Sequence, residues 1–538
     1  MVAEAPADAI ARLESAVRDN PLDPESQFRL AGALQAAGDA AGTSAALHRT
    51  LALVPSFTGA WNNLGLLAAM RGRLPQAALY LRRAIFTGPS GPDGWNNLGN
   101  VLLQVADVDP AVACYRVAVE KDPGNAVLHS NLINGIRLVD GIDAAAELAE
   151  CRRFADRFAA PLTPLVHARP RDPDRRLTVG YVGGDSFRFH TASRSILPLV
   201  EAHDRNAVDV VLFSDTPPGA EDEVTARYRA AARMVPTRGL SDAALAEAIV
   251  REGVDIAVDI IGYPRGSRLL ALARRPAPVQ VNLLLMGSFG MDAIGWAIGD
   301  DLLTPAGSER DFSERLDRID LAFVFDPLLP TPPVSALPAA GGFGITFASL
   351  NQTSKLSPRC IQTWARILAR VPKSRLLLKG RAYADATVAG RIRTIFARHG
   401  IEGRRLDLRG WTVTQATHLD TYRKVDIALD PFPYGGVITT CEAMWMGVPV
   451  VSLQGDRVLG RYGSAFLKAV GLAELAAADE AAYVDAAVAL ASDLGKLAET
   501  RKTLRARISA SRLCDREAYA REVEGAYRRM WRDWCASA

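Results

Sequence analysis

Residues 425–453 read VDIALDPFPYGGVITTCEAMWMGVPVVSL, and the periodicity changes twice along this stretch. A short apolar run closed by Asp430 leads into a Gly-rich loop, then a helical pattern, and Val448 opens a second apolar run. This order predicts a strand, a loop, a helix and a second buried strand. Thr439 and Thr440 stand where the helix should begin, so their hydroxyls and free backbone N–H groups suit a phosphate or diphosphate. Ordinary helix capping explains the same threonines.

The stretch belongs to a longer alternation of buried strands and helices that starts near Arg176. A first set includes LTVGYVGGD, VDVVLFSD, VDIAVDIIGY and VQVNLLLMG, and a second set includes GITFASL, RLLLKG, LDLRG and VPVVSL. A Pro-rich joint at residues 325–338 separates the sets. The pattern predicts two Rossmann-like lobes with a ligand cleft at the carboxyl ends of their strands. We expect the final helices, residues 479–534, to pack across both lobes.

The first part of the chain repeats itself with a period of 34 residues. Pro21, Pro55, Pro89 and Pro123 mark the period, and W-x-x-L-G occurs after two of them, at residues 61–65 and 95–99. Small residues recur where paired helices must approach closely: Thr43, Ala77, Ala111, Thr50, Ala84 and Ala118. This pattern resembles the tetratricopeptide repeat, whose helical hairpins stack into a superhelix with a concave groove.

Asn63, Asn97 and Asn131 recur at one position of the repeat, just before its packing Leu. In a stacked array they would form a row that can hydrogen-bond the backbone of an extended acceptor peptide. The alternative is that they satisfy hydrogen bonds between neighbouring helices.

Composition excludes several classes of protein. The 538 residues carry a net charge of only +3, which does not favour nucleic acid or an anionic membrane as partner. No apolar run reaches the length of a membrane span, and the N-terminus lacks the apolar core of a secretory signal. The six cysteines are far apart, which predicts neither a disulfide framework nor a metal knuckle. We therefore expect a cytoplasmic protein with no bound metal.

Several motifs, in this order, carry a family resemblance: GYVGGDSFRFHTAS, FASLNQTSKLSP, THLDTYRKVDIALDPFPYGG and TTCEAMWMGVPVV, all after the repeats. The chain resembles the O-linked N-acetylglucosamine transferase and Spindly group of protein glycosyltransferases. The resemblance implies a GT-B fold and an inverting, metal-independent transfer from a nucleotide-sugar co-substrate, without another cofactor, to Ser or Thr of a protein. Flagellin is one acceptor known within that group.

The resemblance also implies roles for individual residues. Lys355 would contact the donor diphosphate, with Gln352 beside the nucleotide. Thr439 and Thr440 would contact the donor at the helix N-terminus, and Glu442 would hold the ribose hydroxyls. A solvated surface lysine and simple helix capping are the alternatives for these positions.

Two histidines complete the predicted site. The resemblance places His418 against the nucleotide base. It places His190 in the cleft, after the first strand of the N-terminal lobe, which is called the upper lobe from here on. An imidazole there could accept the proton of the acceptor hydroxyl or position the sugar and diphosphate. Asp185 is a weaker candidate for orienting His190. A lone histidine in either place is otherwise a structural or surface residue.

The chain departs from the family pattern around the expected sugar pocket. Residues 286–291 (MGSFGM) replace a Gly-, Pro- and Thr-rich loop, Val437 and Ile438 replace smaller or polar residues, and Val458 replaces a histidine common in bacterial relatives. These changes predict a different sugar or acceptor geometry. They also leave open a second hypothesis, a catalytically decayed scaffold that only binds partners.

The predicted organisation has four parts. Residues 1–160 form the repeats and a capping helix, and residues 161–175 form a linker. Residues 176–340 form the N-terminal Rossmann-like lobe. Residues 341–538 form the C-terminal lobe, which binds the nucleotide sugar, and the closing helices.

Overall fold

A computed structural model describes residues 6–88, 91–166, 169–342 and 344–537. These residues form two compact units. The repeat unit comprises Met1–Gly135, Gln352–Ser354 and Gly380–Ile395, and the sheet unit comprises Ile136–Asn351, Lys355–Lys379 and Phe396–Ala538.

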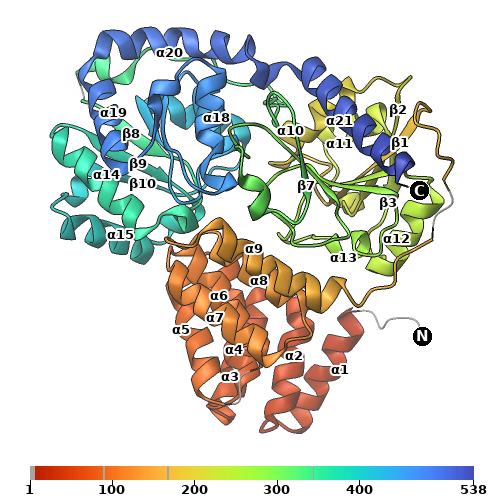
Figure 1. The fold of residues 1–538 in the computed structure, drawn as a ribbon. Helices are drawn as coiled ribbons and strands as arrows, with labels where there is room; N and C mark the ends of the chain where they lie inside the picture. The colour runs from red at the N-terminus through yellow and green to blue at the C-terminus, as the bar shows by residue number, and fades with distance from the viewer. Residues whose placement is uncertain (1–5, 89–90, 167–168, 343, 538) are drawn as a thin grey trace. The chain divides into compact units, whose positions relative to one another are not determined.

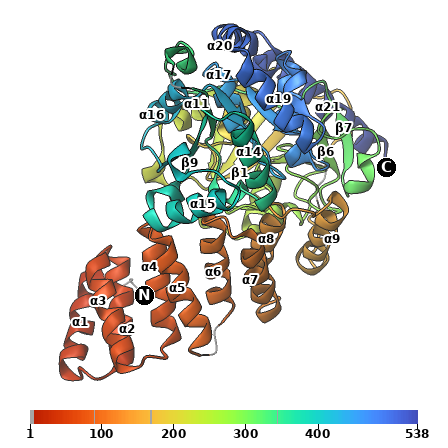
Figure 2. The same cartoon turned by 90° about the vertical axis from the view of Figure 1, so that its left-hand side faces the viewer.

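The repeat unit is an array of antiparallel helical hairpins, which stand side by side in Figure 2. Its helices are α1 (Pro6–Asp19), α2 (Pro24–Ala36), α3 (Ala40–Leu53), α4 (Thr58–Met70), α5 (Leu74–Phe86), α6 (Pro92–Gln104), α7 (Val108–Lys121) and α8 (Ala126–Ile136). The 34-residue period is thus confirmed as pairs of helices. Pro89, one of its markers, lies outside the described residues.

Small residues let the paired helices approach each other closely, as the repeat pattern predicts. All six of the recurring small residues are fully buried: Thr43, Ala77, Ala111, Thr50, Ala84 and Ala118. Gly65 shows why the W-x-x-L-G motif ends in glycine, since a Cβ there would lie 2.5 Å from Cγ of Leu81 on α5.

The repeat unit also includes part of α15 (Ala386–Arg398), where Arg391 donates a hydrogen bond of 2.7 Å to Asp107.

The upper lobe of the sheet unit contains a seven-stranded parallel sheet of order β3-β2-β1-β4-β5-β6-β7. Its strands are β1 (Leu177–Gly184), β2 (Val208–Ser214), β3 (Arg233–Pro236), β4 (Ile256–Asp259), β5 (Val279–Asn282), β6 (Trp296–Gly299) and β7 (Arg315–Arg318). Helices α9 (Ala144–Phe154), α10 (Ser193–Ala202), α11 (Glu223–Ala231), α12 (Asp242–Arg251) and α13 (Leu269–Leu272) accompany them. The near-continuous burial of β1, β2, β4 and β5 is typical of a parallel sheet covered on both faces.

The lower lobe contains a six-stranded parallel sheet of order β10-β9-β8-β11-β12-β13. Its strands are β8 (Thr346–Ser349), β9 (Arg375–Lys379), β10 (Leu406–Arg409), β11 (Ile427–Leu429), β12 (Val450–Leu453) and β13 (Ala476–Ala477). Helices α14 (Pro358–Arg370), α16 (Gln415–Asp420), α17 (Ile438–Trp445) and α18 (Tyr462–Ala469) connect them. The strand, loop, helix and strand predicted within residues 425–453 are therefore confirmed as β11, α17 and β12.

Three closing helices cover both lobes, as predicted: α19 (Glu480–Ser492), α20 (Leu494–Ser509) and α21 (Arg516–Ala536). Helices α19 and α20 pack on the lower lobe, whereas α21 runs beside α10 on the upper lobe (Figure 1). The fold class, a repeat array followed by two Rossmann-like lobes, is thus confirmed.

The proposed boundaries at residues 160, 175 and 340 stay predictions, and residues 167–168 of the predicted linker lie outside the described part. Helix α9 belongs to the sheet unit, where Phe154 packs edge-on against Tyr263 at 5.0 Å between ring centroids. No helix in the described ranges has both the length and the apolar character that a membrane span needs.

Candidate functional site

The two predicted threonines lie in the first turn of α17, where each donates a hydrogen bond to a polar side chain. The Thr439 hydroxyl donates to Oδ1 of Asn351 at 2.9 Å, and the Thr440 hydroxyl donates to Oδ1 of Asp430 at 2.8 Å. Burial raises the pKa of Asp430 to about 6, although the Thr440 hydroxyl opposes that rise. The threonine hydroxyls therefore brace the first turn of α17 while their lone pairs remain available.

Gly436 lies in a space that no side chain could enter. A Cβ at this position would lie 2.3 Å from Oγ1 of Thr440 and 2.7 Å from both Oδ1 of Asp430 and Oγ1 of Thr439. The Gly-rich loop can therefore turn tightly into α17, leaving the amino end of this helix as a suitable place for an anion.

Lys355 lies against the same loop. Its ammonium donates a hydrogen bond of 2.7 Å to the carbonyl oxygen of Gly435 and lies 3.9 Å from the centroid of the Tyr434 ring. Desolvation lowers the pKa of Lys355 to about 8, against the opposing effect of the Asp430 charge. The structure thus brings the predicted lysine and the amino end of α17 together.

Glu442 lies at the centre of a buried charge cluster. Its Oε1 lies 2.9 Å from Nη2 of Arg194 on α10, and its Oε2 lies 3.4 Å from Nε2 of His418 on α16. Burial by itself would raise the pKa of Glu442, but His418 and Arg194 hold the pKa below its usual value. The carboxylate predicted to hold the ribose is thus ionised, and it joins the two lobes.

His190 follows β1, as predicted, and its side chain is exposed. Its Nδ1 accepts a hydrogen bond of 3.2 Å from the backbone N–H of Ala192, and desolvation lowers its pKa. The neighbouring Phe189 ring lies under the guanidinium of Arg194 at 5.1 Å, which links this loop to Glu442. Asp185 instead pairs with Arg188 at 3.1 Å.

The asparagine row of the repeat unit is a chain of hydrogen bonds between repeats. Asn97 donates to Oδ1 of Asn62 at 3.0 Å, and Asn131 donates to Oδ1 of Asn96 at 2.8 Å. Asn63 accepts from Asn62 of its own helix at 3.3 Å. The alternative reading, hydrogen bonds between helices, is thus present. All three predicted asparagines remain half-buried, so peptide binding stays a prediction.

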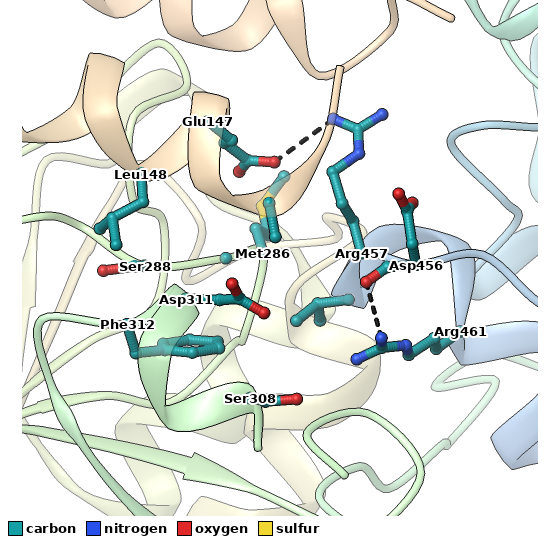
Figure 3. A pocket seen from close by; sticks show the side chains of 13 residues that line it. Glu147, Leu148, Met286, Ser288, Ser308, Asp311, Phe312, Asp456, Arg457 and Arg461 are labelled. Atoms are coloured by element: carbon teal, nitrogen blue, oxygen red, sulfur yellow. Dashed lines mark hydrogen bonds and ion pairs between the residues drawn. The ribbon is translucent and has the colours of Figure 1, made fainter. Parts of the chain in front are cut away.

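Two of the three departures from the family pattern meet in one small cavity of about 20 Å³ (Figure 3). Residues 286–288 and Val458 line it together with Glu147 and Arg457. Glu147 pairs with Arg457 at 3.3 Å. A larger groove of about 700 Å³ shares Asp456 with the small cavity as a lining residue. The cavity holds about one water molecule, and the predicted donor-site residues line neither space.

Gln352 is exposed and belongs to the repeat unit, so its predicted place beside the nucleotide stays a prediction. Three residues that were not predicted from the sequence contact the predicted site residues: Asn351, Lys379 and Asp430. Each stands at or just beyond the carboxyl end of a buried strand. That position in a parallel sheet could have identified them. Arg194 carries no such signal, because its role depends on a contact between lobes.

Comparisons with known proteins agree with this architecture. The family described as "Glycosyl transferase family 41" matches residues 162–326 and 336–523, and a tetratricopeptide-repeat family matches residues 3–42, 34–92 and 76–126. A solved mutant of the Thermobaculum terrenum O-GlcNAc transferase has 34% sequence identity and a TM-score of 0.85, covering 100% of both chains.

Sequence relatives include two proteins named "Probable UDP-N-acetylglucosamine--peptide N-acetylglucosaminyltransferase SPINDLY". The one from Petunia hybrida is 34% identical over 68% of this chain and 40% of its own length. The one from Arabidopsis thaliana is 33% identical over the same shares. The chain therefore spans about two fifths of the length of these curated relatives. Since the family match covers more than half of the 538 residues, this chain belongs to glycosyl transferase family 41.

Proposed function

We propose that the chain is a protein O-glycosyltransferase that moves a sugar from a nucleotide sugar to a Ser or Thr hydroxyl of a protein. The observation that carries the proposal is the convergence of Lys355 with the amino end of α17 on one Gly-rich loop. An ammonium and a helix N-terminus together suit a donor diphosphate. The names of the relatives make UDP-N-acetylglucosamine the first donor to test.

In the proposed reaction the acceptor oxygen bonds to the anomeric carbon from the face opposite the diphosphate. The bond from that carbon to the diphosphate oxygen breaks, and its electron pair leaves with the diphosphate. Lys355 and the amino end of α17 stabilise the charge that develops there. The hydroxyl proton passes to solvent or to the leaving group.

We assign His190 to positioning within this reaction. The Ala192 N–H occupies Nδ1, so the neutral ring carries its proton on Nε2 and offers a donor there. The Nε2–H group can hydrogen-bond an oxygen of the nucleotide sugar and hold it in place. A nitrogen that already carries a hydrogen cannot take the proton of the acceptor hydroxyl.

We also propose that charge stabilisation needs no divalent metal. Lys355 and the amino end of α17 supply positive charge on the loop where the diphosphate is proposed to lie. Transfer at an unchanged rate in excess EDTA would support the proposal. Loss of transfer that added Mg²⁺ or Mn²⁺ restores would contradict it.

Binding of UDP-, GDP- and CMP-sugars, measured by thermal shift, tests the donor site, because a saturating ligand raises stability by RT ln(1 + [L]/Kd). A shift with one nucleotide class supports the transferase. The absence of any shift would favour the decayed scaffold. The apolar residues Val437, Ile438 and Val458, which depart from the family pattern, are the observation that supports this alternative.

The repeat unit is proposed to hold the protein acceptor in the cytoplasm, with flagellin as one candidate. The row of Asn63, Asn97 and Asn131 supports this because each amide keeps hydrogen-bonding capacity beyond its bond within the row. Replacing all three by Ala should reduce glycosylation of a protein acceptor, seen by intact mass, while UDP affinity stays unchanged. Unchanged protein glycosylation would contradict the role of the row.

A further inference from the structure

Lys379 is a buried lysine with an unusual set of partners. Only 2% of the residue is exposed, at the carboxyl end of β9. Its Nζ lies 2.9 Å from Oγ1 of Thr412, 3.1 Å from Oγ1 of Thr421 and 3.1 Å from Nδ1 of His418. An ammonium has three N–H donors, so these three neutral acceptors use them all.

Burial of the Lys379 charge is costly in free energy, which points to a functional role for this lysine. Among the described residues no carboxylate lies within ion-pair distance of Nζ, and Glu442 acts on it only at longer range. A buried ammonium without a paired carboxylate loses solvation that no ion pair restores. Perturbed charges of this kind cluster at functional sites.

The contact with His418 determines where that ring carries its proton. An ammonium can only donate, so Nδ1 of His418 must accept and cannot carry a hydrogen. The neutral ring therefore carries its proton on Nε2, the nitrogen that lies 3.4 Å from Oε2 of Glu442. In the opposite tautomer a hydrogen on Nδ1 would face the ammonium, and a bare Nε2 would face the carboxylate.

The contact with Thr412 anchors a loop that carries an exposed aromatic ring. Trp411 precedes Thr412, is 57% exposed, and lies 5.5 Å from the His418 ring at an interplanar angle of 33°. The indole places an aromatic ring beside the His418 imidazole, and the Glu442 carboxylate, which contacts the same imidazole, can accept from hydroxyls; an aromatic ring and a hydroxyl acceptor together suit a nucleoside.

We propose that Lys379 is a positioning residue of the nucleoside subsite, which fixes His418 as the Nε2–H tautomer and holds the loop that presents Trp411. The nucleoside subsite rests on the function proposed above, whereas the tautomer is a property of the free protein. The other groups that face this cluster are Glu442 on α17, Arg194 on α10, Arg409 on β10 and the Tyr422 ring.

Nitrogen-15 NMR of the histidine-labelled free protein at pH 7 tests the tautomer, with His418→Gln assigning the signals. The wild type should show an unprotonated Nδ1 and a protonated Nε2 for His418. Lys379→Met should move both shifts towards a mixture of tautomers, whereas Lys379→Arg, which keeps a cationic donor, should stay close to the wild type. A proton on Nδ1 in the wild type overturns the proposal without any variant.

The pH profile of the same signals separates positioning from a merely structural role. Burial lowers the pKa of Lys379 to about 8, with Glu442 opposing, so the wild-type shifts should change near pH 8 as the ammonium loses its proton. Lys379→Arg should lack that change. A His418 spectrum that is the same in Lys379→Met and the wild type would overturn the role of Lys379.

UDP, titrated by calorimetry, tests the subsite itself. Lys379→Met should weaken UDP binding about tenfold and Lys379→Arg less, while Lys502→Met, at an exposed lysine of α20, should bind as the wild type does. Equal UDP affinity in all variants would overturn the link between Lys379 and the nucleoside. No UDP binding by the wild type would overturn the subsite and the proposed function together, while the tautomer result would stand.

Discussion

At the scale of single residues, Lys355 combines a hydrogen bond to the proposed donor loop with a perturbed charge. Its ammonium donates to the Gly435 carbonyl, and with a pKa of about 8 it is mostly protonated at pH 7 but loses its proton about one pH unit higher. A bound diphosphate would favour the protonated form, because an opposite charge stabilises the ammonium.

Lys355→Met should weaken UDP binding about 10- to 100-fold, since a charge-assisted hydrogen bond contributes about 1.5–3 kcal/mol. Wild-type affinity should also fall as pH rises through about 8, because the ammonium loses its proton there. Calorimetric titration of UDP from pH 6.5 to 9 measures both effects, with Lys502→Met as the exposed-lysine control. Equal affinity of Lys355→Met and the wild type at pH 7 would rule out the diphosphate contact.

Gly436→Ala should lower stability by about 1–3 kcal/mol, the usual cost of overpacking, and should abolish nucleotide binding. The reason is that its Cβ would collide with oxygens of Thr440, Asp430 and Thr439. Gly435→Ala is the matched control, because there the nearest atom to a Cβ lies 3.3 Å away. Urea unfolding and UDP titration would compare the two, and equal losses would contradict this account.

At the scale of elements, α21 secures the upper lobe through one buried face. Tyr527 and Trp531 are fully buried, and the Trp531 indole donates to the carbonyl oxygen of Asp172 at 2.8 Å. Glu524 accepts from the backbone N–H of Asp204 at 2.8 Å and lies 2.7 Å from Nδ1 of His203. The helix therefore fastens residues on both sides of β1.

Trp531→Ala should lower the free energy of unfolding by about 3–5 kcal/mol, because it removes a buried aromatic side chain and leaves a cavity. Trp534, which stacks on Trp531 at 4.7 Å but is only half-buried, gives the matched control, and Trp534→Ala should cost less than half as much. Denaturant titration of both variants distinguishes them. Similar losses would mean that the buried face of α21 does not govern stability.

At the scale of the whole molecule, the two lobes of the sheet unit meet through buried polar contacts as well as apolar ones. Arg194 of the upper lobe pairs with Glu442 of the lower lobe, and both side chains are only 6% exposed. The Tyr462 hydroxyl of α18 also donates to the carbonyl oxygen of Leu285 at 2.8 Å. The Arg194–Glu442 pair joins α10 to α17, the helix that is proposed to bind the donor, and the Tyr462–Leu285 bond joins α18 to the segment after β5.

Arg194→Met should destabilise the chain by about 3–5 kcal/mol, because it removes the close charged partner of a buried carboxylate and leaves Glu442 with His418 at 3.4 Å. Adding Glu442→Gln should recover part of that loss, so the double variant should be more stable than the sum of the single effects implies. Unfolding in urea measures the cycle. Strict additivity would show that the pair does not couple the lobes.

The exposed pair Arg229–Glu221 provides the control for this cycle. Its coupling should stay below about 1 kcal/mol, because water screens an exposed ion pair.

The local patterns of the sequence determined the elements of this protein. The 34-residue period specifies the helical hairpins, and the change of period within residues 425–453 specifies β11, α17 and β12, because apolar spacing decides which backbone geometry can bury its side chains. Strands β3, β6, β7 and β13 escaped prediction because each is too short or too polar to show a period.

Only the tertiary structure decided how the site is assembled. Lys355 and the threonines could be named from the resemblance, but their partners Gly435, Asn351 and Asp430 could not. The Arg194–Glu442 pair and the Lys379–His418 contact join segments far apart in the chain. Such contacts follow from how strands order in a sheet and how lobes pack, and no local pattern of residues encodes them.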